Sequence, residues 1–213
     1  MAHHGGPAPR SAPGSAPTTM LVVRHGQTTW NAEKRWQGRA DSPLSALGIA
    51  QARSAAGVLE PVDLVVTSSL SRARDTGAII SEALDAPVTA DDELVERDVG
   101  AWTGLTSDEI EAGWPGALAS GAHPDGWESD EAVAARALAA LHRIAAEHPG
   151  TRVLVVTHGG LIRSLERMLG IESPYLANLG GLRVTIDDDE VLVEDRVEII
   201  DHDAVAATVP TSE

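Results

Sequence analysis

The sequence predicts an α/β fold, a three-layer α/β/α sandwich around a mostly parallel β-sheet. Short apolar segments alternate with longer segments that carry apolar residues at helical spacing. Several of the short segments are apolar and β-branched throughout, which is typical of parallel strands covered on both faces. The 213 residues suffice for one domain with a sizeable core.

The first half of the chain predicts five elements. A helical apolar stripe begins after residue 44, and Pro61 ends it. A β-branched run follows Pro61, and a second helical pattern ends before Pro87. In order, we expect a strand at 20–23, a helix at 45–59, a strand at 62–67, a helix at 71–84 and a short strand at 88–89.

The second half continues the alternation. Thr106 and Glu109 have the spacing of a capping box, and a sequence rich in Gly, Pro and Trp follows that helix. The longest helical pattern ends before Pro149. In order, we expect a helix at 106–112, a loop or lid at 113–128, a helix at 129–147, a strand at 152–157, a helix at 161–169 and a hairpin of 182–186 with 191–197.

The termini predict segments outside the folded domain. Residues 1–19 are rich in Pro, Ala, Gly and Ser and lack the apolar region of a signal peptide. We interpret them as a disordered leader that is partly an expression-vector remnant, and a cytoplasmic location is the default. The histidine-bearing domain covers 20–205, with a lid or insert near 105–128. We expect a frayed tail over about the last dozen residues, and we assign 206–213 to it.

Composition excludes several classes of function. The net charge of −16 argues against nucleic-acid partners and against an anionic membrane surface. Any anion site must therefore be a local basic island. The absence of cysteine excludes disulfides, thiol catalysis and cysteine-bound zinc. No run reaches the roughly 18 apolar residues of a membrane helix.

Two predicted strands end in the same way. One runs into Arg24-His25-Gly26, and the other runs into His158-Gly159. Parallel strands end along one sheet edge, where open α/β sheets bind ligands, so neighbouring strands would bring the two histidines together. A single strand-terminal histidine is more often structural, but two, each followed by glycine, indicate a site. Arg24 suits phosphate oxygens, and the backbone N–H groups at Gly159 add donors.

Two further residues are candidates for the same site. Arg72 lies in the first turn of a predicted helix, near its positive dipole end, where a second guanidinium could complete a phosphate clamp. Glu96 follows an apolar pair and could turn inward as the acid. Considered alone, each of these two residues is more simply a solvated surface residue.

Four blocks of residues in fixed order resemble a known family. The first block continues through Trp30-Asn31 and Gln37-Gly38. The blocks are Arg24-His25-Gly26-Gln27-Thr28, Thr67-Ser68-Ser69-Leu70-Ser71-Arg72-Ala73, Leu94-Val95-Glu96 and Val155-Val156-Thr157-His158-Gly159-Gly160. In them the chain resembles the phosphoglycerate-mutase-like branch of the histidine phosphatase superfamily. The resemblance covers about residues 20 to 165, and the C-terminal hairpin matches only loosely.

The resemblance implies a mechanism without metal or other cofactor. His25 would attack phosphorus, and water would hydrolyse the resulting phosphohistidine. Arg24, Arg72 and His158 would stabilise charge on the phosphoryl oxygens, and Glu96 would protonate the leaving alcohol. Neutral donors to phosphate or substrate would come from Thr28, Asn31, Gln37 and Gly38.

The resemblance leaves three functions open. We expect a phosphomonoester hydrolase that acts on a small phosphorylated metabolite of the sugar-phosphate or phosphoglycerate type, with a homodimer as one oligomeric state. A cofactor-dependent phosphoglycerate mutase is the first alternative. Gln27-Thr28, Gly160-Leu161 and the short insert after Glu96 all depart from the pattern of mutases and favour the hydrolase. A non-catalytic module that binds phosphorylated ligands is the second alternative.

Overall fold

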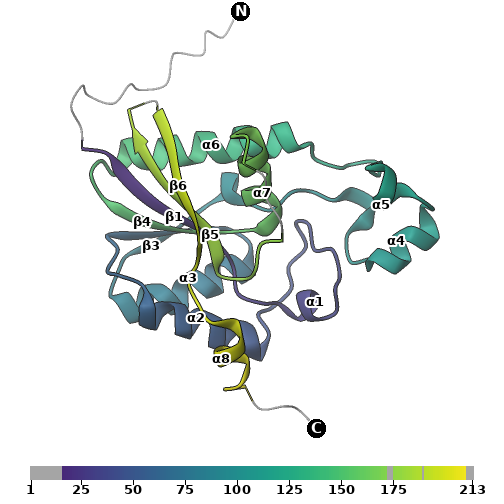
Figure 1. Cartoon of the computed structure of the whole chain (residues 1–213), viewed down its shortest axis with the longest axis horizontal. Helices are drawn as coiled ribbons and strands as arrows, with labels where there is room; N and C mark the ends of the chain where they lie inside the picture. Colours follow the sequence, from purple (N-terminus) through teal and green to yellow (C-terminus); the bar gives the residue numbers. More distant parts are fainter. Residues whose placement is uncertain (1–15, 172–174, 189, 210–213) are drawn as a thin grey trace, which may run out of the picture.

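A six-stranded sheet forms the centre of the computed structural model, which describes residues 16–171, 175–188 and 190–209 (Figure 1). The strand order is β3-β2-β4-β1-β5-β6. The first four strands of that order pair in parallel, and β5 and β6 add an antiparallel hairpin. The strands are β1 (Thr18–Arg24), β2 (Leu64–Ser68), β3 (Val88–Asp91), β4 (Arg152–Thr157), β5 (Gly180–Asp187) and β6 (Glu190–Glu198).

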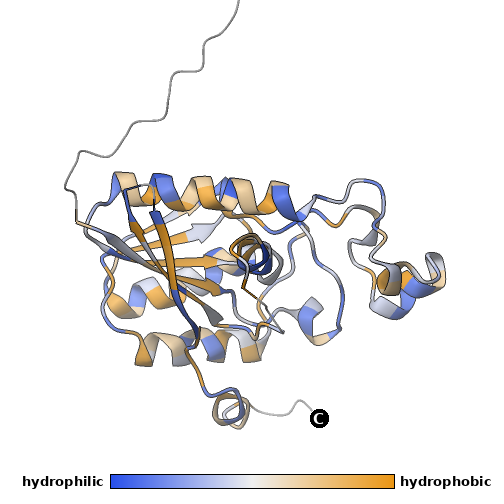
Figure 2. Cartoon of the chain, turned by 45° about the horizontal axis from the view of Figure 1, so that its top comes forward, coloured by the Kyte–Doolittle hydropathy of each residue, from blue (hydrophilic) through white to orange (hydrophobic). Residues whose placement is uncertain are grey.

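Helices cover both faces of the sheet, which confirms the predicted three-layer α/β/α class. Helices α6 and α7 pack on one face, and α2 and α3 pack on the other (Figure 1). Figure 2 shows that the inner sides of these helices are apolar. The helices are α1 (Thr29–Ala32), α2 (Ala46–Val58), α3 (Ser71–Leu84), α4 (Ser107–Gly113), α5 (Ala117–Ser120), α6 (Asp130–Glu147), α7 (Gly159–Met168) and α8 (His202–Ala206), with 3-10 turns at Asp92–Leu94 and Gly100–Trp102.

Several helices begin at the positions that the sequence predicts, because a side chain caps each of them. Ser45 accepts a hydrogen bond from the Gly48 N–H at the start of α2, and Ser129 does the same for α6. Thr106 and Glu109 form the predicted capping box of α4. Each cap satisfies a backbone N–H that has no partner inside its helix.

The insert between β3 and α6 has a small core of its own. Trp102, Ile110 and Ala117 are buried there, with Trp36 and Trp127 packed against them. Figure 1 shows α4 and α5 set to one side of the sheet. The predicted loop at 113–128 thus contains α5, a helix too short to leave a periodic signal.

The C-terminal end differs from the expected frayed tail. Helix α8 occupies part of it, because the Asp201 carboxylate caps the helix and Val205 is buried in the apolar cluster that also contains residues of α2. The expected leader lies mostly outside the described residues, and β1 begins at Thr18 rather than Met20. None of the helices in the described ranges combines the length and hydrophobicity of a membrane crossing.

Gly48 provides a test of this packing. A methyl group at Gly48 would overlap the Gln27 carbonyl oxygen, so we expect Gly48→Ala to lower the free energy of unfolding by about 2 kcal/mol. Gly57 lies on the same helix with open space around it, so Gly57→Ala should raise that free energy by about 0.5–1 kcal/mol. Urea denaturation measures both, and equal effects would contradict the close approach of α2 to residue 27.

Candidate active site

The pairing of β1 with β4 brings the two histidines together. Arg24 and Thr157 are partners at the ends of these parallel strands, and the His25 N–H donates to the Thr157 carbonyl at 2.9 Å. The His25 and His158 rings follow, with centroids 5.2 Å apart and planes at 62°. The carboxyl edge of the sheet therefore presents two imidazoles side by side.

Hydrogen bonds fix the orientation of the His25 ring. Its Nδ1 lies 2.6 Å from the carbonyl oxygen of Gly26, a group that can only accept. Nδ1 therefore carries the proton in the neutral ring, and Nε2 keeps a lone pair. His158 Nε2 lies 2.8 Å from the Ser68 hydroxyl, while its Nδ1 is buried without a partner in the described part of the chain.

Both histidines are held in their neutral form. Burial lowers the pKa of His25 well below 6.5, and the positive charges of Arg72 and Arg24 lower it further, outweighing the hydrogen bond to Gly26. Burial also lowers the pKa of His158, and Arg72 and His25 add to the effect. A neutral imidazole whose Nε2 keeps its lone pair has the form that a nucleophile requires at neutral pH.

Two guanidinium groups flank the histidines. Arg72 is only 1% exposed, and it donates to the carbonyl oxygens of Gly38 and Ala40 at 2.8 Å each. Arg24 donates to the Leu176 carbonyl at 2.7 Å. These backbone acceptors orient the two cations without neutralising them, so the charge stays available to an anion.

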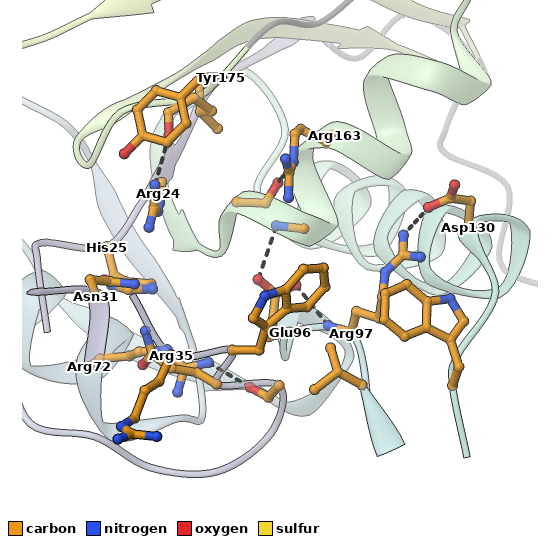
Figure 3. A pocket seen from close by; sticks show the side chains of 18 of the residues that line it. Arg24, His25, Asn31, Arg35, Arg72, Glu96, Arg97, Asp130, Arg163 and Tyr175 are labelled. Atoms are coloured by element: carbon orange, nitrogen blue, oxygen red, sulfur yellow. Dashed lines mark hydrogen bonds and ion pairs between the residues drawn. The ribbon is translucent and has the colours of Figure 1, made fainter. Parts of the chain in front are cut away.

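Glu96 lies at the N-terminus of α7. Its two carboxylate oxygens accept the N–H groups of Gly160 at 2.9 Å and Leu161 at 3.0 Å. A side chain at Gly160 would overlap the carboxylate, so only glycine permits this approach. Glu96 is thus fixed across the cavity from His25 (Figure 3).

His25, Arg24, Arg72 and Glu96 line a cavity of about 470 Å³, whereas His158 is fully buried outside its lining. Seven arginine or lysine side chains and two carboxylates face it, which makes it a basic island in a chain of net charge −16. Such a surplus of cations favours an anionic ligand. The basic residues are Arg24, Lys34, Arg35, Arg72, Arg97, Arg163 and Arg167, and the carboxylates are Glu96 and Asp130.

The predicted neutral donors are not all at the cavity. Asn31, Gln37, Gly38 and Gly159 line it, and Gly38 uses its carbonyl to hold Arg72. Thr28 is fully buried and absent from the lining. Its hydroxyl instead caps α1 by accepting the Asn31 N–H, so it positions Asn31.

Further residues from the insert and from the segment before β5 line the cavity. Arg97 pairs with Asp130, and its guanidinium lies 4.9 Å from the Trp127 ring centre. The His123 ring stacks on Trp127 at 4.1 Å. The Tyr175 ring centre lies 6.0 Å from Arg24 Cζ at the cavity mouth. Trp102, by contrast, is 1% exposed and fills the core of the insert.

A neutral histidine between arginines, opposite a carboxylate at the edge of an α/β sheet, suits phosphoryl transfer. Residues 20–186 match the histidine phosphatase superfamily (branch 1), so the chain belongs to that family and is a phosphatase. This finding confirms the resemblance seen in the four sequence blocks.

Similar proteins show the range of the family around this chain. A glucosyl-3-phosphoglycerate phosphatase from Mycolicibacterium vanbaalenii is 37% identical over 179 residues, which cover 76% of this chain and 79% of that protein. A metal-independent phosphoserine phosphatase from Arabidopsis thaliana is 38% identical over 159 residues, with coverages of 70% and 67%. A phosphoglycerate mutase structure from Bacillus anthracis superposes with a TM-score of 0.75 at 27% identity, with coverages of 90% and 96%.

The lowered pKa values of His25 and His158 predict a stability that falls in mild acid. The folded chain keeps both rings neutral below pH 6.5, whereas the unfolded chain binds a proton on each near that pH. The unfolded state then holds more protons, so lowering the pH below 6.5 reduces the free energy of unfolding. The limit is about 1.4 kcal/mol per pH unit for each histidine.

Urea denaturation between pH 7 and 5.5 measures this slope. His25→Asn should show a shallower slope than the parent protein, and the double variant with His158→Asn a shallower one again. Identical slopes in all three proteins would contradict the burial of neutral histidines.

Proposed function

We propose that the protein is a metal-independent phosphomonoester hydrolase that acts through a phosphohistidine on His25. The observation that carries this proposal is the fixed neutral ring of His25, with Nδ1 tied to Gly26 and Nε2 free beside Arg24 and Arg72. The arginines supply the positive charge that phosphoryl transfer requires.

The first step forms a bond between His25 Nε2 and phosphorus while the bond from phosphorus to the leaving alcohol oxygen breaks. Arg24 and Arg72 stabilise the charge on the phosphoryl oxygens, and an N–H on His158 Nδ1 adds a donor. Glu96 gives its proton to the leaving oxygen. Among the described residues its Oε2 accepts one hydrogen bond, from Gly160, which leaves a lone pair for this exchange.

The second step releases phosphate. A water molecule attacks phosphorus, the bond from phosphorus to Nε2 breaks, and the electron pair returns to His25. Glu96, now a carboxylate, takes the proton of the attacking water and is ready for another cycle. Two displacements at one phosphorus thus replace one difficult hydrolysis.

The cavity favours a small phosphorylated metabolite whose alcohol carries a second anionic group. Arg24 and Arg72 face the phosphoryl group in this proposal, and Arg163 on α7 adds a further cation to the lining. Arg97 and Arg167 also line the cavity, and both pair with Asp130. A cavity of about 470 Å³ suits a small ligand. The relatives named for glucosyl-3-phosphoglycerate and phosphoserine support sugar-phosphate or phosphoglycerate-type substrates.

Release of inorganic phosphate tests the reaction. We expect turnover on 3-phosphoglycerate, a sugar phosphate and 4-nitrophenyl phosphate, and a phosphohistidine trapped by rapid alkaline quench. His25→Ala should lower the rate by at least about a thousandfold, because it removes the nucleophile. Turnover by His25→Ala at the parent rate, or product phosphate moved to another hydroxyl instead of released, would overturn the proposal.

Arg163 tests the substrate class. Among the described residues its guanidinium has one acceptor, the Gly159 carbonyl at 3.2 Å, which leaves other N–H groups open to the cavity. We expect Arg163→Met to lower kcat/KM for 3-phosphoglycerate about tenfold or more, and that for 4-nitrophenyl phosphate less than threefold.

Arg74→Met is the matched control, since Arg74 is exposed on α3 and does not line the cavity. It should leave kcat/KM unchanged for both substrates. Equal losses on the two substrates in Arg163→Met would show that Arg163 acts on the phosphoryl group rather than on the leaving alcohol.

A further inference from the structure

Residues 175–179, just before β5, hold the corner that contains Arg24 and His25. The Leu179 N–H donates to the Arg24 carbonyl at 2.9 Å, and the Leu176 carbonyl accepts from the Arg24 guanidinium at 2.7 Å. The Asn178 side-chain amide donates to the His25 carbonyl at 2.8 Å. No sequence motif falls on these residues, yet they contact both residues of the Arg24-His25 pair.

The backbone of this segment is fixed in a costly conformation. Leu179 has a φ of +59° although it carries a side chain, and it is fully buried. A left-handed conformation costs roughly 1–2 kcal/mol for a residue with a Cβ, so surrounding contacts must hold it. The pairing of β5 with β1, with Gly181 opposite Val23, supplies some of those contacts.

Asn178 forms a hydrogen bond to one edge of the peptide group between His25 and Gly26. The carbonyl of the peptide between His25 and Gly26 accepts from Asn178, and its N–H donates to the Thr76 hydroxyl at 3.0 Å. Because a peptide is planar, two bonds on opposite edges fix its rotation. The next carbonyl, that of Gly26, orients the imidazole through Nδ1, so the direction of Nε2 depends on this plane.

We propose that Asn178 is a positioning residue that aims His25 Nε2 at phosphorus. The inference rests on the proposed role of His25 as nucleophile. Asn178 is 7% exposed and does not line the cavity, so it acts through His25 rather than on the substrate. Arg72 is oriented by the Gly38 and Ala40 carbonyls and Arg24 by the Leu176 carbonyl, so the Asn178 side chain acts on His25 and on neither guanidinium.

Asn178→Asp tests the proposal, because it keeps the shape and replaces the donor with an oxygen that repels the His25 carbonyl. We expect the rate of phosphohistidine formation from 4-nitrophenyl phosphate to fall by about ten- to a hundredfold. Rapid alkaline quench measures this rate. The inhibition constant of inorganic phosphate as a competitive inhibitor should change less than threefold. The loss relative to the parent protein should shrink as the pH is lowered, since burial raises the pKa of the introduced carboxyl and its protonated form can donate again.

Two further variants keep the test decisive. Asn178→Ala removes the donor without adding charge, so it should slow phosphohistidine formation at every pH without recovery in acid, and it decides the matter if Asn178→Asp does not fold. Ser81→Ala removes a buried hydrogen bond from a side chain to the Ala86 carbonyl, away from the cavity, and should lower stability alone.

The outcomes separate this inference from the proposed function. Parent protein that forms no phosphohistidine overturns the proposed function itself. Parent protein that forms it, with both Asn178 variants forming it equally fast, overturns only the positioning role. A parallel loss of phosphate affinity and rate would also overturn it, because Asn178 would then shape the anion site rather than the aim of His25.

Discussion

The parallel pairing of β1 with β4 is the constraint on which the rest of the site depends. It sets Arg24 opposite Thr157, so that both strands end at one level and both following residues are histidines. Helix α7 then starts beside β1, and its first N–H groups receive Glu96. A shift of one residue in this register would turn each side chain to the other face of the sheet and separate the two imidazoles.

At this edge of the sheet, burial and neighbouring positive charges both lower the pKa of the two histidines. Burial disfavours a charged imidazole, and Arg72 next to both rings disfavours it further. The same arginine favours an anion in the cavity. Burial and Arg72 therefore keep His25 unprotonated, and Arg72 also favours an anion in the cavity, so this one buried cation contributes to both effects.

Much of the fold follows from local signals in the sequence. Ser45, Thr106 and Ser129 cap helices at the expected positions because a cap is a local hydrogen bond. The strand-terminal histidines were visible because each follows an apolar run. Thr28 and Asn178 could not be assigned in this way, since a hydroxyl that caps α1 and an amide that reaches residue 25 from 153 positions away depend on tertiary placement. Helix α8 escaped notice because five residues leave no periodicity.

The basic cavity lies within a strongly acidic chain, and this contrast shapes how far its attraction extends. Charges are screened over about 8 Å at physiological ionic strength, so an approaching phosphate monoester meets mainly the negative surface until it nears the rim. Capture is therefore a short-range event rather than long-range steering. Once inorganic phosphate has passed the rim on its way out, the same acidic surface repels it and discourages its return.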